Sequence, residues 1–370
     1  MPHDMDSVEI SLLTCGPRPN VYSLYGHTAI RYRDKTHGTD LAINYGMFSF
    51  SKPHFILRFV FGLTDYEMGI EYFSDFLSQY APSGCGVRQQ TLNLTNEEKA
   101  AIAAAIDENF QPQNRVYRYN YFYDNCTTRA RDMILSHMSH AIEYTNGGKP
   151  QDVTFRSMIH AYNETHRWAR FGNDLLLGIK ADLPTTFEEQ QFLPVNLSKD
   201  FAQATVANAK GTKQHFVTSD TWVLPRTGNV GSDSFPISPT VCFAIFAAFT
   251  VALTVVELRR KSSYWLFDAI VMLADGICGT ILLAMVFSQH PTVSLNLQIL
   301  LLNPLSLVAL FPTVKAMRNR RSNIWMKILS VCIILFLIGG FFQSYAEGMY
   351  FVALSLLLRY SVKFYQFKKK

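Results

Sequence analysis

The pattern of hydrophobic and polar positions divides the chain into two parts. As far as about residue 232, apolar, charged and turn residues are mixed, whereas from Phe235 long apolar runs alternate with short polar patches. Each run has about the length of an α-helix that crosses ~30 Å of hydrocarbon, with the third and fifth at the short end. A helix in a soluble core would not stay apolar on every face for this length five times over. The runs are Phe235–Val256, Trp265–Phe287, Leu297–Val314, Ile324–Phe342 and Gly348–Val362.

Basic residues indicate which way the predicted helices cross the membrane. They follow the first, third and fifth runs, whereas residues 288–296 and 343–347, after the second and fourth runs, contain no Lys or Arg. Loops rich in Lys and Arg stay in the cytoplasm. We therefore predict a multi-pass protein of the bacterial inner membrane, with a periplasmic soluble domain, residues 1–232, and a domain of about five transmembrane helices, residues 233–370, that ends in the cytoplasm. The clusters are Arg259, Arg260 and Lys261; Lys315, Arg318, Arg320 and Arg321; and Arg359, Lys363 and Lys368–Lys370.

These clusters account for the net charge of +5, which is therefore no evidence for a nucleic-acid partner. The predicted topology has a further consequence, because a domain exported ahead of the first helix needs a basic segment followed by an apolar core. Residues 1–12, MPHDMDSVEISL, contain no such signal. We expect that a signal peptide has been removed; the alternative is an inverted topology.

The soluble part has the pattern of an α+β domain. Strands are predicted where apolar residues alternate with polar ones, and HTAIRYR and DLAINY read as an antiparallel pair joined by the polar turn DKTHGT. Thr95 and Glu98 form a capping box at the start of a helix over 97–110. A second helix is predicted to begin after Asp124 or Asn125. The other predicted elements are the strands Val8–Thr14 and Val87–Leu94, a helix over Glu71–Tyr80 and an extended aromatic segment over Tyr117–Tyr123.

Cys126 and His27 are the residues of this domain that carry the clearest chemistry. Cys126 lies at a helix start, where unpaired N–H groups and the helix dipole favour a thiolate and can stabilise an oxyanion. His27 opens a predicted strand, and a His beside a Cys is the minimal arrangement for an acyl-enzyme. Asn44 or Asp40, on the neighbouring strand, would orient the imidazole. The alternative is that Cys126 is a small buried hydrophobic residue and His27 a turn residue.

The other cysteines give weaker signals. Cys15 and Cys85 can form a disulfide on the oxidising side of the membrane or remain thiols, and a disulfide would leave Cys126 as the odd cysteine of the domain. The membrane cysteines have the character of packing residues. The histidine pairs His137/His140 and His160/His166 have no Cys or Glu at a recognised ligand spacing, so no metal site is predicted.

One carboxylate lies inside an apolar run. A charged Asp275 is costly in hydrocarbon, so its side chain is expected to face the interior of the helix bundle. There it would either make a structural hydrogen bond to a neighbouring helix or line a groove for an acyl or diacylglycerol group. Gly276 and Gly279 would let helices approach closely.

Four motifs in order resemble the Lnb-type family of lipoprotein N-acyltransferases. They are YGHTAIRYRD, NYGMFSF, YRYNYFYDNCTTRARDMI and RFGNDLLLGIKADLP, which together span most of the soluble part. The order of a strand His and an Asn-Cys at a helix start also resembles, more distantly, the permuted papain-like fold of the NlpC/P60 superfamily and its lecithin:retinol acyltransferase branch. That branch commonly has a second His as its third residue, whereas this chain has Asp40, Asn44 and Tyr45 in that region.

The resemblance implies an acyltransferase that needs no metal or diffusible cofactor. An acyl chain would pass from a phospholipid to Cys126 as a thioester, with His27 as acid and base, and then to the α-amine of a diacylglyceryl-cysteine lipoprotein. Asn125 belongs to the matching motif, and Tyr25, Tyr123, Asp124 and Arg129 flank the proposed pair; Arg129 would bind a head group or pair with Asp132 or another carboxylate. Two alternatives remain at this point: a membrane-anchored cysteine peptidase or amidase acting on peptidoglycan, and a non-catalytic membrane scaffold.

Overall fold

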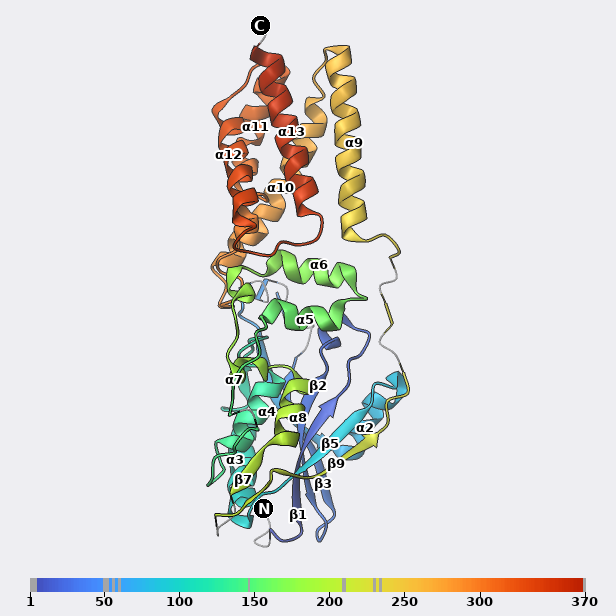
Figure 1. The fold of residues 1–370 in the computed structure, drawn as a ribbon, viewed down its shortest axis with the longest axis vertical. Helices are drawn as coiled ribbons and strands as arrows, with labels where there is room; N and C mark the ends of the chain where they lie inside the picture. The colour runs from blue at the N-terminus through green and yellow to red at the C-terminus, as the bar shows by residue number, and fades with distance from the viewer. Residues whose placement is uncertain are drawn as a thin grey trace. The chain divides into compact units, whose positions relative to one another are not determined.

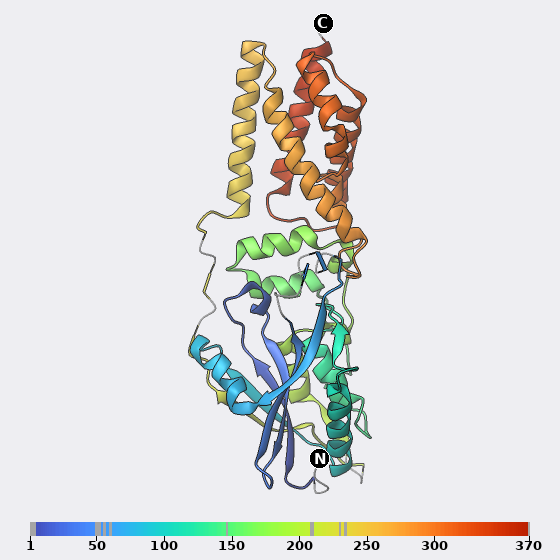
Figure 2. The same cartoon turned by 180° about the vertical axis from the view of Figure 1, so that it is seen from behind.

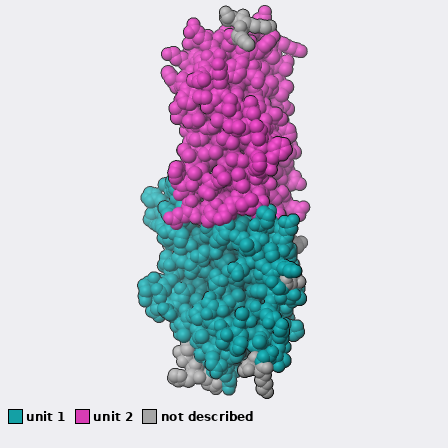
Figure 3. All heavy atoms as spheres, turned by 60° about the vertical axis from the view of Figure 1, so that its left-hand side comes forward, with its two compact units in different colours: residues 1–155, 184–232 teal, residues 156–183, 233–370 magenta. Residues whose placement is uncertain are grey.

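The computed structural model describes residues 5–48, 53–54, 57–58, 61–145, 147–207, 211–228, 231–232 and 235–368. The start of the chain, the end of the NYGMFSF motif and the last two lysines of the basic tail lie outside these residues. The chain forms two compact units, residues 1–155 with 184–232 and residues 156–183 with 233–370 (Figure 3). The second unit therefore includes a segment, 156–183, that comes before the predicted boundary at residue 232.

Unit 1 is built on a seven-stranded antiparallel sheet in the order β6-β4-β3-β2-β1-β5-β9 (Figure 1). Alternation along β1 explains how both faces become covered: Ile10 and Leu12 point into one apolar cluster, and Leu13 and Cys15 into another. The strands are β1 Val8–Cys15, β2 His27–Asp34, β3 Thr39–Met47, β4 Asp65–Tyr72, β5 Val87–Leu92, β6 Val116–Arg118 and β9 Val217–Leu224. A separate two-stranded sheet pairs β7 Thr205–Ala207 with β8 Lys213–His215.

Helices cover the two faces of this sheet unequally. The larger cluster packs Ile102, Ile134 and Phe201 of three helices against one face, and Phe73 and Phe76 of α2 cover the other (Figures 1 and 2). The helices are α2 Phe73–Tyr80, α3 Asn96–Phe110, α4 Cys126–Leu135, α7 Phe187–Gln190 and α8 Pro194–Gln203, with short 3-10 turns η1 Val21–Ser23 and η2 Ala81–Ser83. The α+β prediction is confirmed, and so is the capping box of Thr95 and Glu98 at the start of α3.

Two predicted segments of unit 1 differ from the structure. The helix expected from Glu71 begins only at Phe73, because Glu71 and Tyr72 end strand β4, whose alternate residues Tyr66 and Met68 are buried. The aromatic segment expected over Tyr117–Tyr123 is a strand only as far as Arg118 and then turns.

Unit 2 consists of the apolar helices and the segment 156–183. Within the described residues, three stretches are long and apolar enough to cross a membrane, namely Pro239–Arg260, Trp265–Val286 and Leu297–Arg318, and a shorter apolar helix spans Ile324–Gly339. The third stretch is broken at Asn303-Pro304, because a proline lacks an amide hydrogen and disfavours helical geometry in the residue before it. The elements are α5 Phe155–Asn163, α6 Arg167–Leu176, η3 Ile179–Asp182, α9 Pro239–Arg260, α10 Trp265–Val286, η4 Leu297–Leu300, α11 Leu305–Arg318, α12 Ile324–Gly339 and α13 Met349–Lys368.

Two residues of the predicted basic tail are buried ion-pair partners instead of loop charges. Arg359 bonds Asp268 through two nitrogens, at 2.7 and 2.9 Å, and reaches Glu257 at 2.6 Å. Lys363 bonds Glu257 and lies 3.2 Å from Asp268. The four charges cancel, so the tail is less basic than its sequence suggests. The clusters after the first and third runs lie at helix ends and in the following turns.

Asp275 makes a structural hydrogen bond, as one of the two alternatives anticipated. Its carboxylate accepts from the hydroxyl of Ser306 at 2.5 Å and from the amide of Asn303 at 3.4 Å, so it links helix α10 to the beginning of α11. Gly276 and Gly279 permit this approach, because a Cβ at either position would lie within 2.7 Å of atoms of the segment 302–307.

Candidate active site

Helix α4 begins at Cys126 because Asn125 caps it. Asn125 has extended backbone angles, and its side-chain oxygen accepts from the amides of Thr127 at 2.8 Å and Thr128 at 3.0 Å. Thr128 in turn accepts from the Asn125 amide at 2.9 Å, which completes a capping box. The Asn125 side-chain NH₂ is held by the carbonyls of Tyr121 and Phe192, both at 2.9 Å. Asn125 is thus fully used in fixing the position of the helix start.

The capping by Asn125 leaves the backbone amide of Cys126 unpaired among the described residues. Because the Asn125 oxygen takes the Thr127 and Thr128 amides, the N–H of Cys126 itself finds no hydrogen-bond partner among the described residues. An unpaired N–H beside the sulfur has the right chemistry to receive the negative oxygen that forms when the sulfur attacks a carbonyl.

His27 faces Cys126 from the first position of β2, and a chain of three further side chains lies behind it. The His27 Nε2 atom is 3.0 Å from the side-chain oxygen of Asn44. The Asn44 NH₂ donates to one oxygen of Glu71 at 2.8 Å, and Gln79 donates to the other at 2.6 Å. The His27 ring and the Cys126 sulfur lie close enough for each to shift the pKa of the other.

This chain fixes the protonation of the imidazole. Since a carboxylate only accepts, Glu71 forces Asn44 to turn its NH₂ toward strand β4 and its oxygen toward His27. Nε2 must then carry a hydrogen to donate to that oxygen. The other ring nitrogen, Nδ1, is left to exchange a proton with Cys126.

The pKa values of the pair shift in opposite directions. Burial alone would raise the pKa of the Cys126 thiol, but the facing His27, its hydrogen bond and those from the Thr28 amide and Thr127 lower it. Burial alone would lower the pKa of His27, but the Cys126 sulfur and the hydrogen bond to Asn44 raise it. Both shifts favour a thiolate facing an imidazolium.

The other two cysteines of unit 1 differ from Cys126 in their burial. Cys15 and Cys85 are both buried and both free thiols, so no disulfide joins them. Burial raises the pKa of Cys15 far above its ordinary value. The pKa of Cys126 is lowered instead.

Gly46, near the end of β3, lies directly beside the nucleophile. Its φ of +84° lies in the left-handed region, and a Cβ added there would be 3.7 Å from Cys126 Cβ and 3.7 Å from the Tyr119 ring. The register between β3 and β4 shifts between Asn44 and Met47 at this point. The left-handed residue and the register shift therefore lie where β3 passes the nucleophile.

Aromatic rings surround the pair. Tyr25 meets Tyr121 edge to face at 5.3 Å, and Tyr119 stacks on Tyr66 at 4.1 Å. Burial, followed by the charges of neighbouring groups including Cys126, raises the pKa values of Tyr119 and Tyr121, so both phenols stay neutral. From Tyr66 the row of rings continues through Phe48, at 4.9 Å, to Tyr22, at 5.7 Å from Phe48. Tyr22 is 58% exposed, so the row runs from the partly buried nucleophile to the surface.

The predicted site residues are only partly brought together. Cys126, His27 and Asn44 meet, Asn125 holds the helix start, and Tyr25 lies in the aromatic wall. Asp40 lies four residues, or about 13 Å, from Asn44 along β3 and pairs with Arg31 at 2.6 Å. Tyr45 points the other way and donates to Asn109 at 2.9 Å.

Arg129 takes one of the roles considered for it, the pairing with a carboxylate. Its guanidinium bonds Asp124 through two nitrogens, at 2.6 and 2.8 Å, and lies 3.4 Å from the ring centre of Tyr117. Asp132, the partner considered by name, pairs with Arg131 instead. Tyr123 packs edge to face against Phe155 at 5.3 Å.

Two residues of the chain behind His27, Glu71 and Gln79, were missed by sequence reasoning. The stretch DYEMGIEY alternates well enough to predict a strand, and continuing that alternation to Glu71 would have placed it beside the Asn44 strand. Nothing in the sequence identifies Gln79, which reaches Glu71 from helix α2. Within the residues that the structure describes, no three His, Cys, Asp or Glu side chains are grouped as metal ligands would be.

Two models of known protein families match the chain, one in each of its two parts. The family model described as the Lnb N-terminal periplasmic domain matches residues 2–161, and the one described as the Lnb transmembrane domain matches residues 231–370. Searches of curated proteins and of solved structures gave no match. The chain therefore belongs to the Lnb family, as a membrane protein with a periplasmic N-terminal part.

Proposed function

We propose that this protein is a phospholipid:apolipoprotein N-acyltransferase with Cys126 as its nucleophile. The observation that carries the proposal is the pairing of Cys126, at a capped helix start with an unpaired amide, with a His27 that Asn44 holds in one orientation. A cysteine arranged in this way forms thioesters. Membership of a family with a transmembrane part supports a lipid as the acyl source.

In the first half-reaction the Cys126 thiolate attacks the ester carbonyl carbon of a phospholipid. A carbon–sulfur bond forms, and the carbonyl oxygen takes the negative charge beside the Cys126 N–H. As the carbonyl re-forms, the carbon–oxygen bond to the glycerol breaks. The proton on His27 Nδ1 goes to the departing oxygen, which leaves as lysophospholipid, and His27 becomes neutral.

In the second half-reaction the α-amine of a diacylglyceryl-cysteine attacks the thioester. His27 Nδ1 takes a proton from the amine, the carbon–nitrogen bond forms and the carbon–sulfur bond breaks. The products are an N-acylated lipoprotein and the original thiolate–imidazolium pair. Every proton that moves is carried by His27, so the cycle needs no metal or diffusible cofactor.

The row of rings from Tyr119 to Tyr22 suits an acyl chain. Aromatic faces provide an apolar surface that does not compete for the carbonyl. Burial raises the pKa values of Tyr119 and Tyr66, so these two phenols remain neutral. We infer that the chain lies along these rings while its carbonyl is held at Cys126. Head group and acceptor would then approach from the opposite side of the sulfur.

The finer architecture is part of the same proposal. Helix α4, which carries the nucleophile, packs against β2, which carries His27, and this order supports a permuted papain-like domain of the NlpC/P60 type. The apolar helices α9, α10, α11, α12 and α13 would provide five crossings of the inner membrane, with the C-terminus in the cytoplasm. Both substrates are lipids of that membrane, and lateral diffusion would bring them to the enzyme.

Mass spectrometry tests this function directly. The purified protein is incubated with a phospholipid of one defined acyl mass and then with a synthetic diacylglyceryl-cysteine peptide. We expect the acyl mass on Cys126 in the first step and on the peptide α-amine in the second. Cys126→Ala should do neither, whereas Cys85→Ala, which removes a buried thiol of the same unit, should do both.

Two outcomes would contradict the proposal. Acylation of the peptide by Cys126→Ala would remove the nucleophile from its role. Cleavage of a peptidoglycan fragment by the wild-type protein, with no acyl mass on Cys126, would favour the peptidase or amidase that shares this pair of residues.

A further inference from the structure

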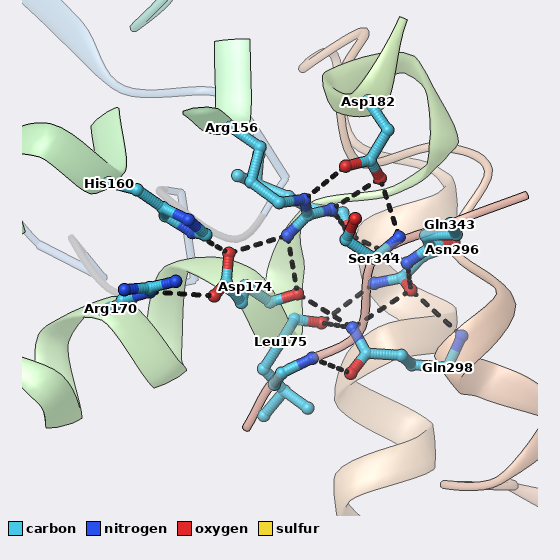
Figure 4. Close-up of polar contacts among 12 residues, drawn as sticks. Arg156, His160, Arg170, Asp174, Leu175, Asp182, Asn296, Gln298, Gln343 and Ser344 are labelled. Atoms are coloured by element: carbon cyan, nitrogen blue, oxygen red, sulfur yellow. Dashed lines mark hydrogen bonds and ion pairs between the residues drawn. The ribbon is translucent and has the colours of Figure 1, made fainter. Parts of the chain in front are cut away.

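Helix α6 of unit 2 is fastened to loops between the apolar helices. The last carbonyls of a helix lack partners inside it, and here side-chain amides supply them (Figure 4). Asn296 donates to the Leu175 carbonyl at 2.8 Å, Gln298 to the Asp174 carbonyl at 2.8 Å, and Gln343 to the Leu177 carbonyl at 3.0 Å. Asn296 and Gln343 belong to the two connections without basic residues, 288–296 and 343–347, and Gln298 lies in η4 directly after the first of them.

The same helix touches the beginning of α9. The Phe171 ring lies 5.5 Å from that of Phe243, and the Trp168 indole donates to the Ile237 carbonyl at 2.9 Å, two residues before α9 starts. Helix α6 contacts the point where the apolar helix α9 begins, and it carries a Trp there. These are features of an interfacial helix that lies among lipid head groups. With the orientation proposed above, these are head groups of the outer leaflet.

On its polar side α6 presents a carboxylate with three basic neighbours. Asp174, whose side chain is 4% exposed, accepts from Arg156 at 2.7 Å and from His160 Nε2 at 2.8 Å. Arg156 is also bound by Asp182 at 2.7 Å and donates to the Leu177 carbonyl at 3.2 Å, so its hydrogen-bonding capacity is taken up inside the protein (Figure 4).

Arg170, unlike Arg156, keeps its side-chain hydrogen-bond donors available. Its Nε lies 3.9 Å from Asp174, too far for a hydrogen bond, and its side chain makes no hydrogen bond to the described residues. Its side chain is 29% exposed. His160, 21% exposed, uses one ring nitrogen on Asp174 and has no second partner among the described residues. Asp174 therefore orients two basic side chains side by side without using up their donors (Figure 4).

We propose that Arg170 and His160 bind the phosphodiester of a phospholipid head group, with the exposed Arg167 of the same helix as a flanking cation. A guanidinium presents two parallel N–H groups that match two oxygens of one phosphate. A lipid fits better than a soluble phosphate because the apolar side of α6 packs on the helices that enter the bilayer. The inference deepens the proposed function, on which its orientation and its choice of phospholipid rest.

Lipid retention tests the site without any acyl transfer. Full-length protein carrying Cys126→Ala is purified in dodecyl maltoside, given phosphatidylglycerol, and analysed by native mass spectrometry. We expect one tightly retained lipid, and a loss of retention of about tenfold when Arg170→Gln is added. Arg170→Lys keeps the positive charge but loses the paired N–H groups of the guanidinium. Its lipid retention should therefore fall between that of the parent and that of Arg170→Gln. Arg321→Gln removes an exposed cation from the α11–α12 turn and is the matched control.

Each outcome decides the matter. Equal retention by Arg170→Gln and Arg321→Gln would overturn the site, provided that both unfold at the same temperature as the parent. Displacement of the lipid by an equal concentration of glycerophosphate would overturn the choice of a lipid. If Cys126 takes no acyl chain from phospholipid while Arg170→Gln still loses the lipid, the proposed function fails and the head-group site stands.

Discussion

At the scale of single residues, the charge state of Cys126 decides whether the site can work. Its pKa is lowered against the effect of burial, chiefly by His27. The thiolate is therefore present above that lowered pKa and is lost as the pH falls through it. The imidazolium is present below the raised pKa of His27 and is lost as the pH rises through it. The ion pair occupies the window between the two values.

The first prediction follows from this window. Iodoacetamide should alkylate Cys126 at a pH well below the ordinary pKa of a thiol, and His27→Ala should move the midpoint upward by at least one pH unit. The rate of alkylation against pH, followed by the mass of the peptide that contains Cys126, measures both. Asn44→Ala should move the alkylation midpoint upward by less, because it removes only the hydrogen bond that holds His27. An unchanged midpoint in His27→Ala would show that the helix start alone lowers the pKa.

Glu71 acts through Asn44, and a second prediction tests this. Glu71→Gln replaces a pure acceptor by a group that also donates, so Asn44 is free to turn and offer its NH₂ to His27. We expect acyl transfer to fall about tenfold to a hundredfold, as for the loss of a hydrogen bond to a charged group, and the alkylation midpoint to rise. Glu67→Gln is the control, on the same strand but with its side chain 41% exposed beside Arg115. If both variants keep the wild-type midpoint, Glu71 has no positioning role.

At the scale of elements, alternation and capping predict most of unit 1. Four strands begin or end within two residues of the predicted positions, and two of the three predicted helix starts, after Thr95 and after Asn125, are capped as expected. Glu71 was misplaced because a strand and a helix meet there without a turn residue between them. Which partner His27 takes follows from strand register, and register comes from long-range pairing that the local pattern does not contain.

Gly46 gives a prediction about the end of a strand. Gly46→Ala should cost about 1–2 kcal/mol of stability, because a residue with a Cβ is strained in the left-handed region. It should also slow alkylation of Cys126, since relief of the strain moves the backbone between Asn44 and the nucleophile. Gly38→Ala is a matched control: Gly38 also has a positive φ, +67°, but a Cβ there meets nothing within 4 Å. Thermal unfolding should report a similar loss in both, and the alkylation rate a loss in Gly46→Ala alone.

At the scale of the whole molecule, composition alone separates the sheet domain from the apolar helices, because burial in lipid demands long runs without charge. The same reasoning could not foresee that residues 156–183 join the compact unit of the helices. That segment is attached by amide–carbonyl bonds and ring contacts, which leave no mark on a hydropathy pattern. Nor could charge counting foresee that Arg359 and Lys363 are neutralised by acidic residues of two other helices.

The buried quartet of Glu257, Asp268, Arg359 and Lys363 leads to the last prediction. Helices α9, α10 and α13 each contribute to it, and all four side chains are at most 3% exposed. Glu257→Gln leaves a buried positive charge uncompensated, so we expect a loss of about 3–5 kcal/mol of stability, measured by thermal unfolding in detergent. Glu257→Gln combined with Lys363→Met restores neutrality and should recover most of that loss, whereas Lys327→Met, at an exposed site on α12, should change little. A double variant no more stable than Glu257→Gln would mean that hydrogen-bond geometry, and not charge balance, holds the three helices together.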